Sequence, residues 1–169
     1  MDYALMQREH AEWLTRNYPN QPPEIPAAGL VEEAGELMHA ALKLKQMGLW
    51  GEEGDYTQDK LQGKLVDAVG DVAVYVCSCC NANGWDYDTL VREAKCSFSA
   101  ASLPMLRAAI QVVSSTVTHA AQPSRSMLRR VLIDLYWFAK DALVDFDECV
   151  TRTWAIVKQR SRTEARRPA

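Results

Sequence analysis

The sequence lacks a surplus of positive charge, a secretory leader and an apolar run long enough to cross a bilayer. Its 19 Lys and Arg against 22 Asp and Glu give a formal charge of −3, whereas an electrostatic nucleic-acid binder carries a basic surface. Residues 1–4 contain neither the basic nor the apolar part of a signal peptide, and no segment approaches the length of a transmembrane helix. These absences predict a cytoplasmic protein without nucleic-acid or membrane partners.

The chain has five cysteines, an odd number, and three of them lie within residues 77–80. Because secreted scaffolds use spaced, even-numbered cysteine frameworks, we expect reduced thiols here. A zinc site at Cys77 and Cys80 would need a second ligand pair at suitable spacing, and the sequence offers none. In an apolar helix these cysteines are expected to behave as small hydrophobic residues.

Alternating patterns typical of β-strands are absent, and apolar residues recur instead at helical spacing. This periodicity predicts an all-α helix bundle that forms a single domain over residues 1–169. We expect Gly48 and Gly84 to end the second and third helices. The expected helices cover residues 3–17, 26–47, 58–83, a short helix capped by Asp86 or Asp88 that ends near Ser97, 103–121, and 126–158 with a break near Asp145.

The chain also contains a weak internal repeat. Residues 71–76 align with residues 134–139, and residues 86–91 align with residues 145–150. The second copy is four residues shorter between these parts, about one helical turn, which a helix pair tolerates. Chance similarity between amphipathic helices is the alternative to a tandem duplication.

A duplication would divide the single domain into unequal parts. These are a motif-bearing half at residues 30–91, a candidate degenerate second copy at residues 103–158 and a basic tail at residues 159–169. The second copy has no acid between Leu106 and Ala121, so we expect it to be scaffold. The tail is expected to be a solvated terminus, with contact to phosphate as the alternative.

The most informative pattern is acidic. A Glu-Glu-Ala-Gly-Glu run at residues 32–36 lies on the second expected helix, and Asp67 and Asp71 lie one turn apart on the third. On a helical wheel Glu33 and Glu36 flank the apolar stripe, whereas Glu32 lies further round. Converging carboxylates raise one another's pKa unless a hard cation such as Mg2+ or Mn2+ takes up the charge. The predicted metal ligands are therefore Glu33, Glu36, Asp67 and Asp71.

These residues resemble the MazG-like branch of the all-α nucleoside triphosphate pyrophosphohydrolases. The family's signature is Glu-Glu-x-x-Glu on one helix and Glu-x-x-Asp on the next. The run at residues 32–36 matches the first motif, and Gly70-Asp71 with its apolar run is similar to the core of the second. The chain departs from the family at Ala68, where an acid is usual, so that Asp67 is the nearest carboxylate.

The resemblance implies hydrolysis of a (deoxy)nucleoside triphosphate to the monophosphate and pyrophosphate, with Mg2+ as the cofactor. Glu32 or Glu33 would be the catalytic base that accepts a proton from the attacking water. Members of the family usually dimerise, so a homodimer is expected, with the second half replacing part of that packing. The implied partner is a nucleoside triphosphate.

The substrate-binding residues are expected on the same two helices. Lys43 and Lys64 would neutralise phosphate charge, although ordinary surface lysines are the alternative. Tyr75 shares a flank with the aspartates, and Asn81 and Asn83 would read the base near the end of the helix. A helix stop at Asn83-Gly84 is the alternative interpretation.

Two other classes of protein compete. Glu36 and His39 form a Glu-x-x-His motif typical of di-iron bundles, but the residues three before His10 and His119 are Gln7 and Thr116, so the required second copy is missing. The stronger alternative is a catalytically degenerate module of the same fold that binds nucleotides or another protein, because Ala68 and the acid-poor second half both depart from the family.

Overall fold

The computed structural model describes residues 1–51, 57–97 and 103–160, and the described residues form helices with no strand among them. The predicted all-α helix bundle is confirmed. The helices are α1 (Tyr3–Asn17), α2 (Glu24–Trp50), α3 (Gln58–Asn83), α4 (Tyr87–Ser97), α5 (Met105–Ala121), α6 (Arg125–Asp141) and α7 (Phe146–Val157).

Helix α2 ends later than the sequence predicted. Gly48 lies within the helix, and the chain leaves it at Gly51, whose φ is +88° and whose N–H donates to the carbonyl of Met47 at 2.8 Å. A glycine with ordinary helical angles weakens a helix without ending it, whereas a positive φ does end it. The expected stop at Gly48 is therefore wrong by three residues.

The predicted break near Asp145 is confirmed, because α6 and α7 are separate helices. The turn between them is built like the turn between α3 and α4. In each turn a residue of positive φ, Gly84 at 67° or Leu143 at 57°, is followed by an amide that bonds the carbonyl five residues back at 2.9 Å. Asp86 and Asp145 then cap the next helix through backbone amides at 2.6 and 2.8 Å.

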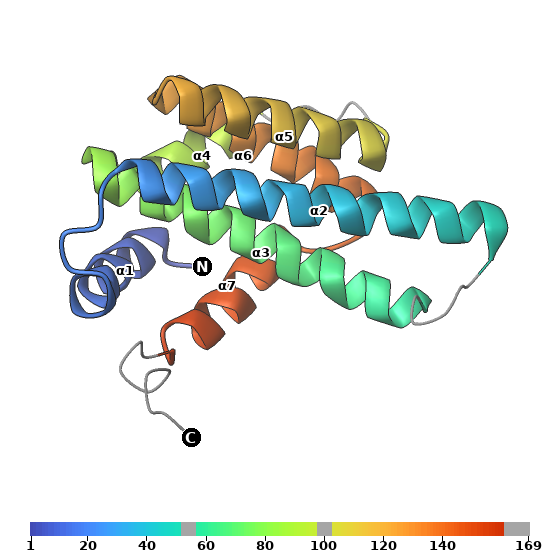
Figure 1. Cartoon of the computed structure of the whole chain (residues 1–169), viewed down its shortest axis with the longest axis horizontal. Coiled ribbons are helices and arrows are strands. Elements are labelled where there is room, and N and C mark those ends of the chain that lie inside the picture. The colour runs from blue at the N-terminus through green and yellow to red at the C-terminus, as the bar shows by residue number, and fades with distance from the viewer. Residues whose placement is uncertain (52–56, 98–102, 161–169) are drawn as a thin grey trace.

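The helices also pair in two similar sets (Figure 1). Helix α2 lies along α3, and α5 lies along α6, while α2 and α5 pack against each other. Helix α3 contacts α7, and α6 contacts α4. Exchanging α2, α3 and α4 with α5, α6 and α7 leaves these pairings unchanged, which supports the internal duplication that the sequence suggested.

Helix α3 is the central helix of the bundle, with nearly continuous burial from Ala68 to Cys80. By length and composition α3 could cross a membrane, so the expectation that no segment reaches that length is wrong. However, 67% of its most apolar window is buried inside the fold, as is usual for a core helix. Four of the five free cysteines are buried, three of them in α3.

Candidate functional site

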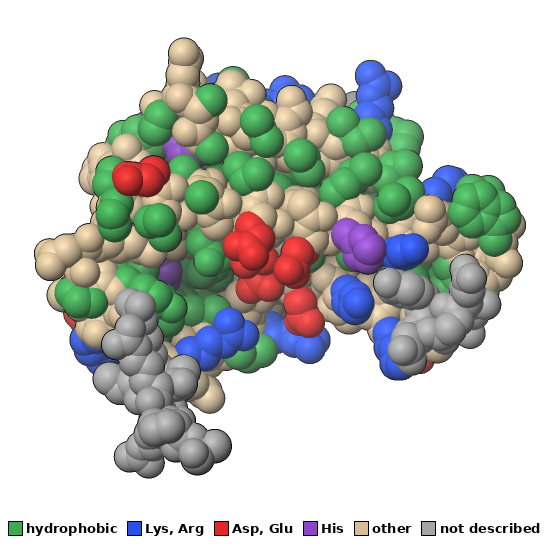
Figure 2. Space-filling view, in the orientation of Figure 1, with side chains coloured by type: hydrophobic (Ala, Val, Ile, Leu, Met, Phe, Trp, Pro, Cys, Tyr) green, Lys and Arg blue, Asp and Glu red, His purple; other side chains and the backbone are tan. Residues whose placement is uncertain are grey.

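Acidic side chains gather at the middle of one face of the molecule, over α2 and α3 (Figure 2). Glu33 of α2 is partly buried, while Glu32 and Glu36 of the same helix are exposed. Burial, and then the charges of Asp71, Glu36 and Glu32, raise the pKa of Glu33 to about 7. The structure thus places the acids of the first motif within electrostatic reach of Asp71.

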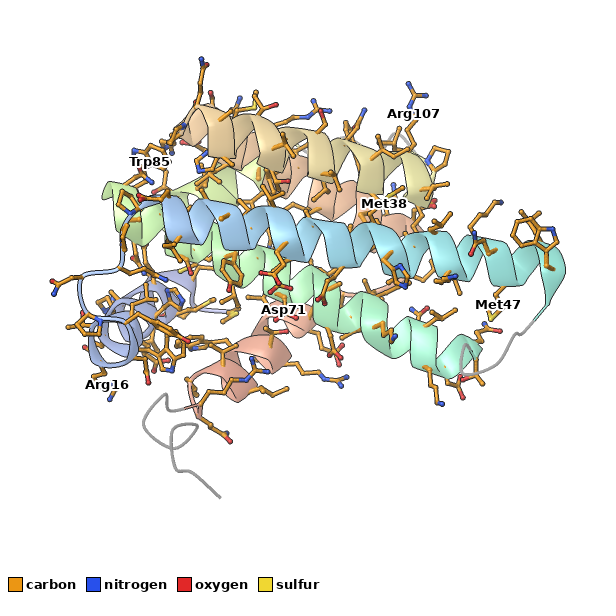
Figure 3. The ribbon with its side chains drawn as sticks, viewed as in Figure 1. Arg16, Met38, Met47, Asp71, Trp85 and Arg107 are labelled. Atoms are coloured by element: carbon orange, nitrogen blue, oxygen red, sulfur yellow. The ribbon has the colours of Figure 1, made fainter. Side chains whose placement is uncertain are left out.

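Asp71 lies where α2, α3 and α7 meet (Figure 3). It is partly buried, and burial raises its pKa to about 6, helped by the charges of Asp67 and Glu36. The positive charge of Arg160 opposes this rise. Asp67, one turn away, is exposed and lies 3.6 Å from the guanidinium of Arg152 on α7. The four predicted metal ligands therefore belong to one electrostatic cluster.

These carboxylates suit a hard divalent cation by donor type and charge. Oxygen ligands are what Mg2+ and Mn2+ prefer, and a cation would relieve the repulsion that raises the pKa values of Glu33 and Asp71. In the described part of the chain, however, no three acidic, His or Cys side chains already stand close enough to hold an ion. Coordination would require side-chain rotation of the exposed Glu36 and Asp67, and Asp67 would have to leave its pairing with Arg152.

A cavity of about 640 Å³ adjoins the acidic cluster, and Glu33 and Asp71 line it. Its wall includes the aromatic side chains of Trp13, Tyr18 and Tyr75. Helix α1 and the segment after it therefore contribute much of the wall, although no role was predicted for them. The signal that could have found them is Trp13 and Tyr18, which lie near the end of α1, in the stretch that precedes the acidic helix.

His10 lies at the inner wall of this cavity and is buried. It packs between Trp13, at 5.9 Å between ring centroids, and Trp154, at 5.3 Å. The Asn81 amide lies 3.1 Å from its Nδ1, and the Ser78 hydroxyl lies 3.2 Å from its Nε2. Since burial lowers the pKa of His10 to about 4, the ring is neutral and serves as packing for the wall.

Only one of the predicted substrate-binding residues lines the cavity. Tyr75 does so, and its pKa is raised by burial and by the charge of Glu33. The Asn81 side chain is held by α1 through His10, and Asn83 donates to the carbonyl of Cys79 in its own helix at 2.8 Å. Lys43 is partly buried on α2 and Lys64 is exposed on α3, and neither lines the cavity.

Of the residues of the competing metal sites, Glu36 belongs to the acidic cluster, and none lines this cavity. Glu36 and His39 are exposed on α2. Cys77 and Cys80 are fully buried in α3, and burial raises the pKa of the Cys80 thiol to about 12. Both thiols lie in the apolar interior of α3, where cysteine behaves as a small hydrophobic residue.

Comparison with known proteins adds no relative. A scan against protein-family models, a search of curated proteins and a search of solved structures each found no match to this chain. The functional assignment therefore depends on the residues and their geometry.

Proposed function

We propose that this protein hydrolyses (deoxy)nucleoside triphosphates to the monophosphate and pyrophosphate with Mg2+, or Mn2+, as the cofactor. The observation that supports this most is that Glu33 and Asp71 line a cavity of about 640 Å³ whose wall also includes three aromatic side chains. A cavity of this size suits a small ligand. Aromatic rings stack on a nucleobase, and clustered carboxylates bind the cation that accompanies phosphate.

The roles of the acids follow from their surroundings. Glu33, Glu36, Asp67 and Asp71 would hold the cation, which when bound would shield the phosphate charge and lower the pKa of a water. Glu33, which is partly buried beside Asp71, would accept the proton of that water. Glu32 is the other candidate base, because it is exposed and adjacent to Glu33.

The second candidate is a degenerate module that binds nucleotides or another protein without turnover. Two observations favour it: an alanine stands at residue 68, and the described residues hold no preassembled group of three ligands. A homodimer, a cytoplasmic location and the absence of nucleic-acid and membrane partners stay predictions. Sedimentation of the chain at twice its 19.0 kDa mass would support the homodimer.

Turnover separates the two candidates. Pyrophosphate release is measured from a panel of ribo- and deoxynucleoside triphosphates with Mg2+, for the native protein and for Glu36→Gln and Asp71→Asn. We expect release from the native protein and a loss of at least about 100-fold in both variants without a lower melting temperature, because the substitutions remove cation ligands and keep side-chain shape.

Glu12→Gln is the matched control, since Glu12 is an exposed acid on α1 that does not line the cavity. Its turnover is expected to equal that of the native protein. Magnesium-dependent nucleotide binding without release would establish the degenerate module instead. Near-native turnover in Glu36→Gln or Asp71→Asn would show that the ligand assignment is wrong.

A further inference from the structure

Helix α7 crosses α3 at the residue before Asp71. A Cβ atom at Gly70 would lie 2.0 Å from Oγ1 of Thr153 and 2.7 Å from the carbonyl oxygen of Cys149. The two backbones can approach this closely only because residue 70 has no side chain. Consequently α7, from the second half of the chain, lies directly beside the acidic cluster (Figure 3).

Two arginines from this segment reach the acidic face. Arg152, on α7, lies 3.6 Å from the exposed carboxylate of Asp67. Arg160, just past the end of α7, lines the same cavity as Glu33 and Asp71. Its charge lowers the pKa of both carboxylates, against the effect of burial. Both guanidinium groups therefore act on the carboxylates of the other half.

The backbone at Arg160 is held in place from two sides. Its N–H donates to the carbonyl of Val157 at 3.0 Å, which continues the last turn of α7. Its own carbonyl accepts a hydrogen bond from the indole N–H of Trp13, also at 3.0 Å. Trp13 is part of the aromatic wall of the cavity. Arg160 thus contacts the aromatic wall through its backbone and lines the same cavity as the two carboxylates.

For electrostatic reasons, the binding of a nucleotide here needs a positively charged side chain in addition to the metal ion. A nucleoside triphosphate with one Mg2+ still carries net negative charge, and it would meet the carboxylates of α2 and α3. Repulsion between like charges in a partly buried site opposes its entry. A guanidinium binds phosphate oxygens through two parallel hydrogen bonds, which a lysine cannot do.

We propose that Arg160 binds the phosphate chain of the substrate, so that the second half of the protein completes a site whose cation ligands come from the first half. The inference uses the proposed function for the nature of the substrate. Arg152 takes a smaller part, because its exposed pairing with Asp67 is weak and exchangeable. The group that Arg160 would recognise is a polyphosphate anion, whether free or attached to a nucleoside.

The test measures binding rather than turnover. The full chain is titrated calorimetrically with inorganic tripolyphosphate in excess Mg2+, as the native protein and as Arg160→Gln, Arg160→Lys and Lys158→Gln. We expect Arg160→Gln to weaken binding about 10- to 100-fold, the usual effect of losing a charged hydrogen bond. Arg160→Lys should lose less affinity for tripolyphosphate than Arg160→Gln, since it keeps the positive charge.

Lys158→Gln is the matched control. Lys158 is two residues from Arg160, pairs with Glu9 at 3.8 Å and does not line the cavity. The affinity of Lys158→Gln for tripolyphosphate should therefore stay within about twofold of the native value. Melting temperatures of all variants are compared first. If Arg160→Gln does not fold, the comparison of Arg160→Lys with Lys158→Gln still tests the proposal. A loss of affinity in Arg160→Lys alone would support it, and equal affinities would overturn it.

The inference is overturned if the native protein does not bind tripolyphosphate, if Arg160→Gln binds it within twofold of native, or if Lys158→Gln is weakened equally. Failure of the proposed function gives a different result. In that case the native protein releases no pyrophosphate from any nucleotide, yet binds tripolyphosphate in a manner that depends on Arg160.

Discussion

Gly29 of α2 lies directly against the ring of Tyr75 in α3: a Cβ atom at residue 29 would lie 2.1 Å from Cε1 of the tyrosine. This contact lets the two helices close over Tyr75 and keeps its ring in the wall of the cavity beside Glu33. The glycine one turn before the acidic run therefore shapes the site as directly as the acids do.

The Gly29→Ala variant is expected to be less stable than the native protein. The added methyl group overlaps the Tyr75 ring, and overpacking of this kind costs about 1–3 kcal/mol, or several degrees of melting temperature. Gly35→Ala is the control, since nothing lies within 4 Å of its Cβ position and alanine stabilises a helix by about 0.5–1 kcal/mol. Melting temperatures are measured by thermal unfolding. A shift of both variants in the same direction would contradict the contact between Gly29 and Tyr75.

The contribution of Glu33 and Asp71 to the stability of the metal-free protein should fall as pH rises between about 4 and 7. The pKa of Glu33 rises from 4.5 to about 7 on folding, and that of Asp71 from 3.8 to about 6. At these two carboxyl groups the folded state therefore binds more protons than the unfolded state, which lowers the free energy of unfolding as pH rises. His10, whose pKa falls from 6.5 to about 4 on folding, acts in the opposite direction, so a variant is needed to isolate the carboxyl groups.

Glu33→Gln should remove part of this decrease. The free energy of unfolding is measured with denaturant, in the presence of chelator, at pH 5 and pH 8. Between these pH values the free energy of unfolding of the variant, relative to that of the native protein, is expected to rise by on the order of 1 kcal/mol, a value discounted for solvent screening. Added Mg2+ at pH 8 should raise the native melting temperature more than that of the variant. Parallel pH profiles for the two proteins would mean that Glu33 does not titrate in this window.

The two aspartates of α3 should differ in their effect on turnover. Asp71 is partly buried in the cluster, whereas the Asp67 side chain is 54% exposed and paired with Arg152. We expect Asp71→Asn to lower kcat by at least about 100-fold and Asp67→Asn by about 10-fold or less. Steady-state kinetics at saturating Mg2+ measure both. Equal losses would make Asp67 a full equivalent of the acid that the resembled family carries three residues before its aspartate.

The two left-handed turns predict opposite effects on stability. Leu143 has a φ of +57° and is 90% exposed, so Leu143→Gly relieves backbone strain without loss of packing. Its melting temperature should rise, by the equivalent of about 1 kcal/mol. Gly84→Ala, at a φ of +67° in the matching turn, should cost about the same amount. Stabilisation by both substitutions, or by neither, would contradict the similarity of the turns.

Local signals explain why parts of the fold could be predicted. Helices α1 and α3 have the predicted bounds, because the prolines after residue 17 and the left-handed Gly84 end helices through local geometry. The cap at Asp86 was predicted for the same reason. The end of α2 was not predicted correctly. A glycine ends a helix where it takes a positive φ, and residue type alone does not show where that happens.

Helical periodicity sufficed to place the acids. Residues three and four apart share a helix face, so one sequence shows that Glu33 and Glu36 flank one apolar stripe and that Asp67 and Asp71 flank another. What those acids meet could not be read from spacing, because contacts between distant segments have no period. Long-range packing brought Trp13 and Arg160 into the wall of the cavity that Asp71 lines, and close approach at Gly70 made the packing of α7 against α3 sterically feasible.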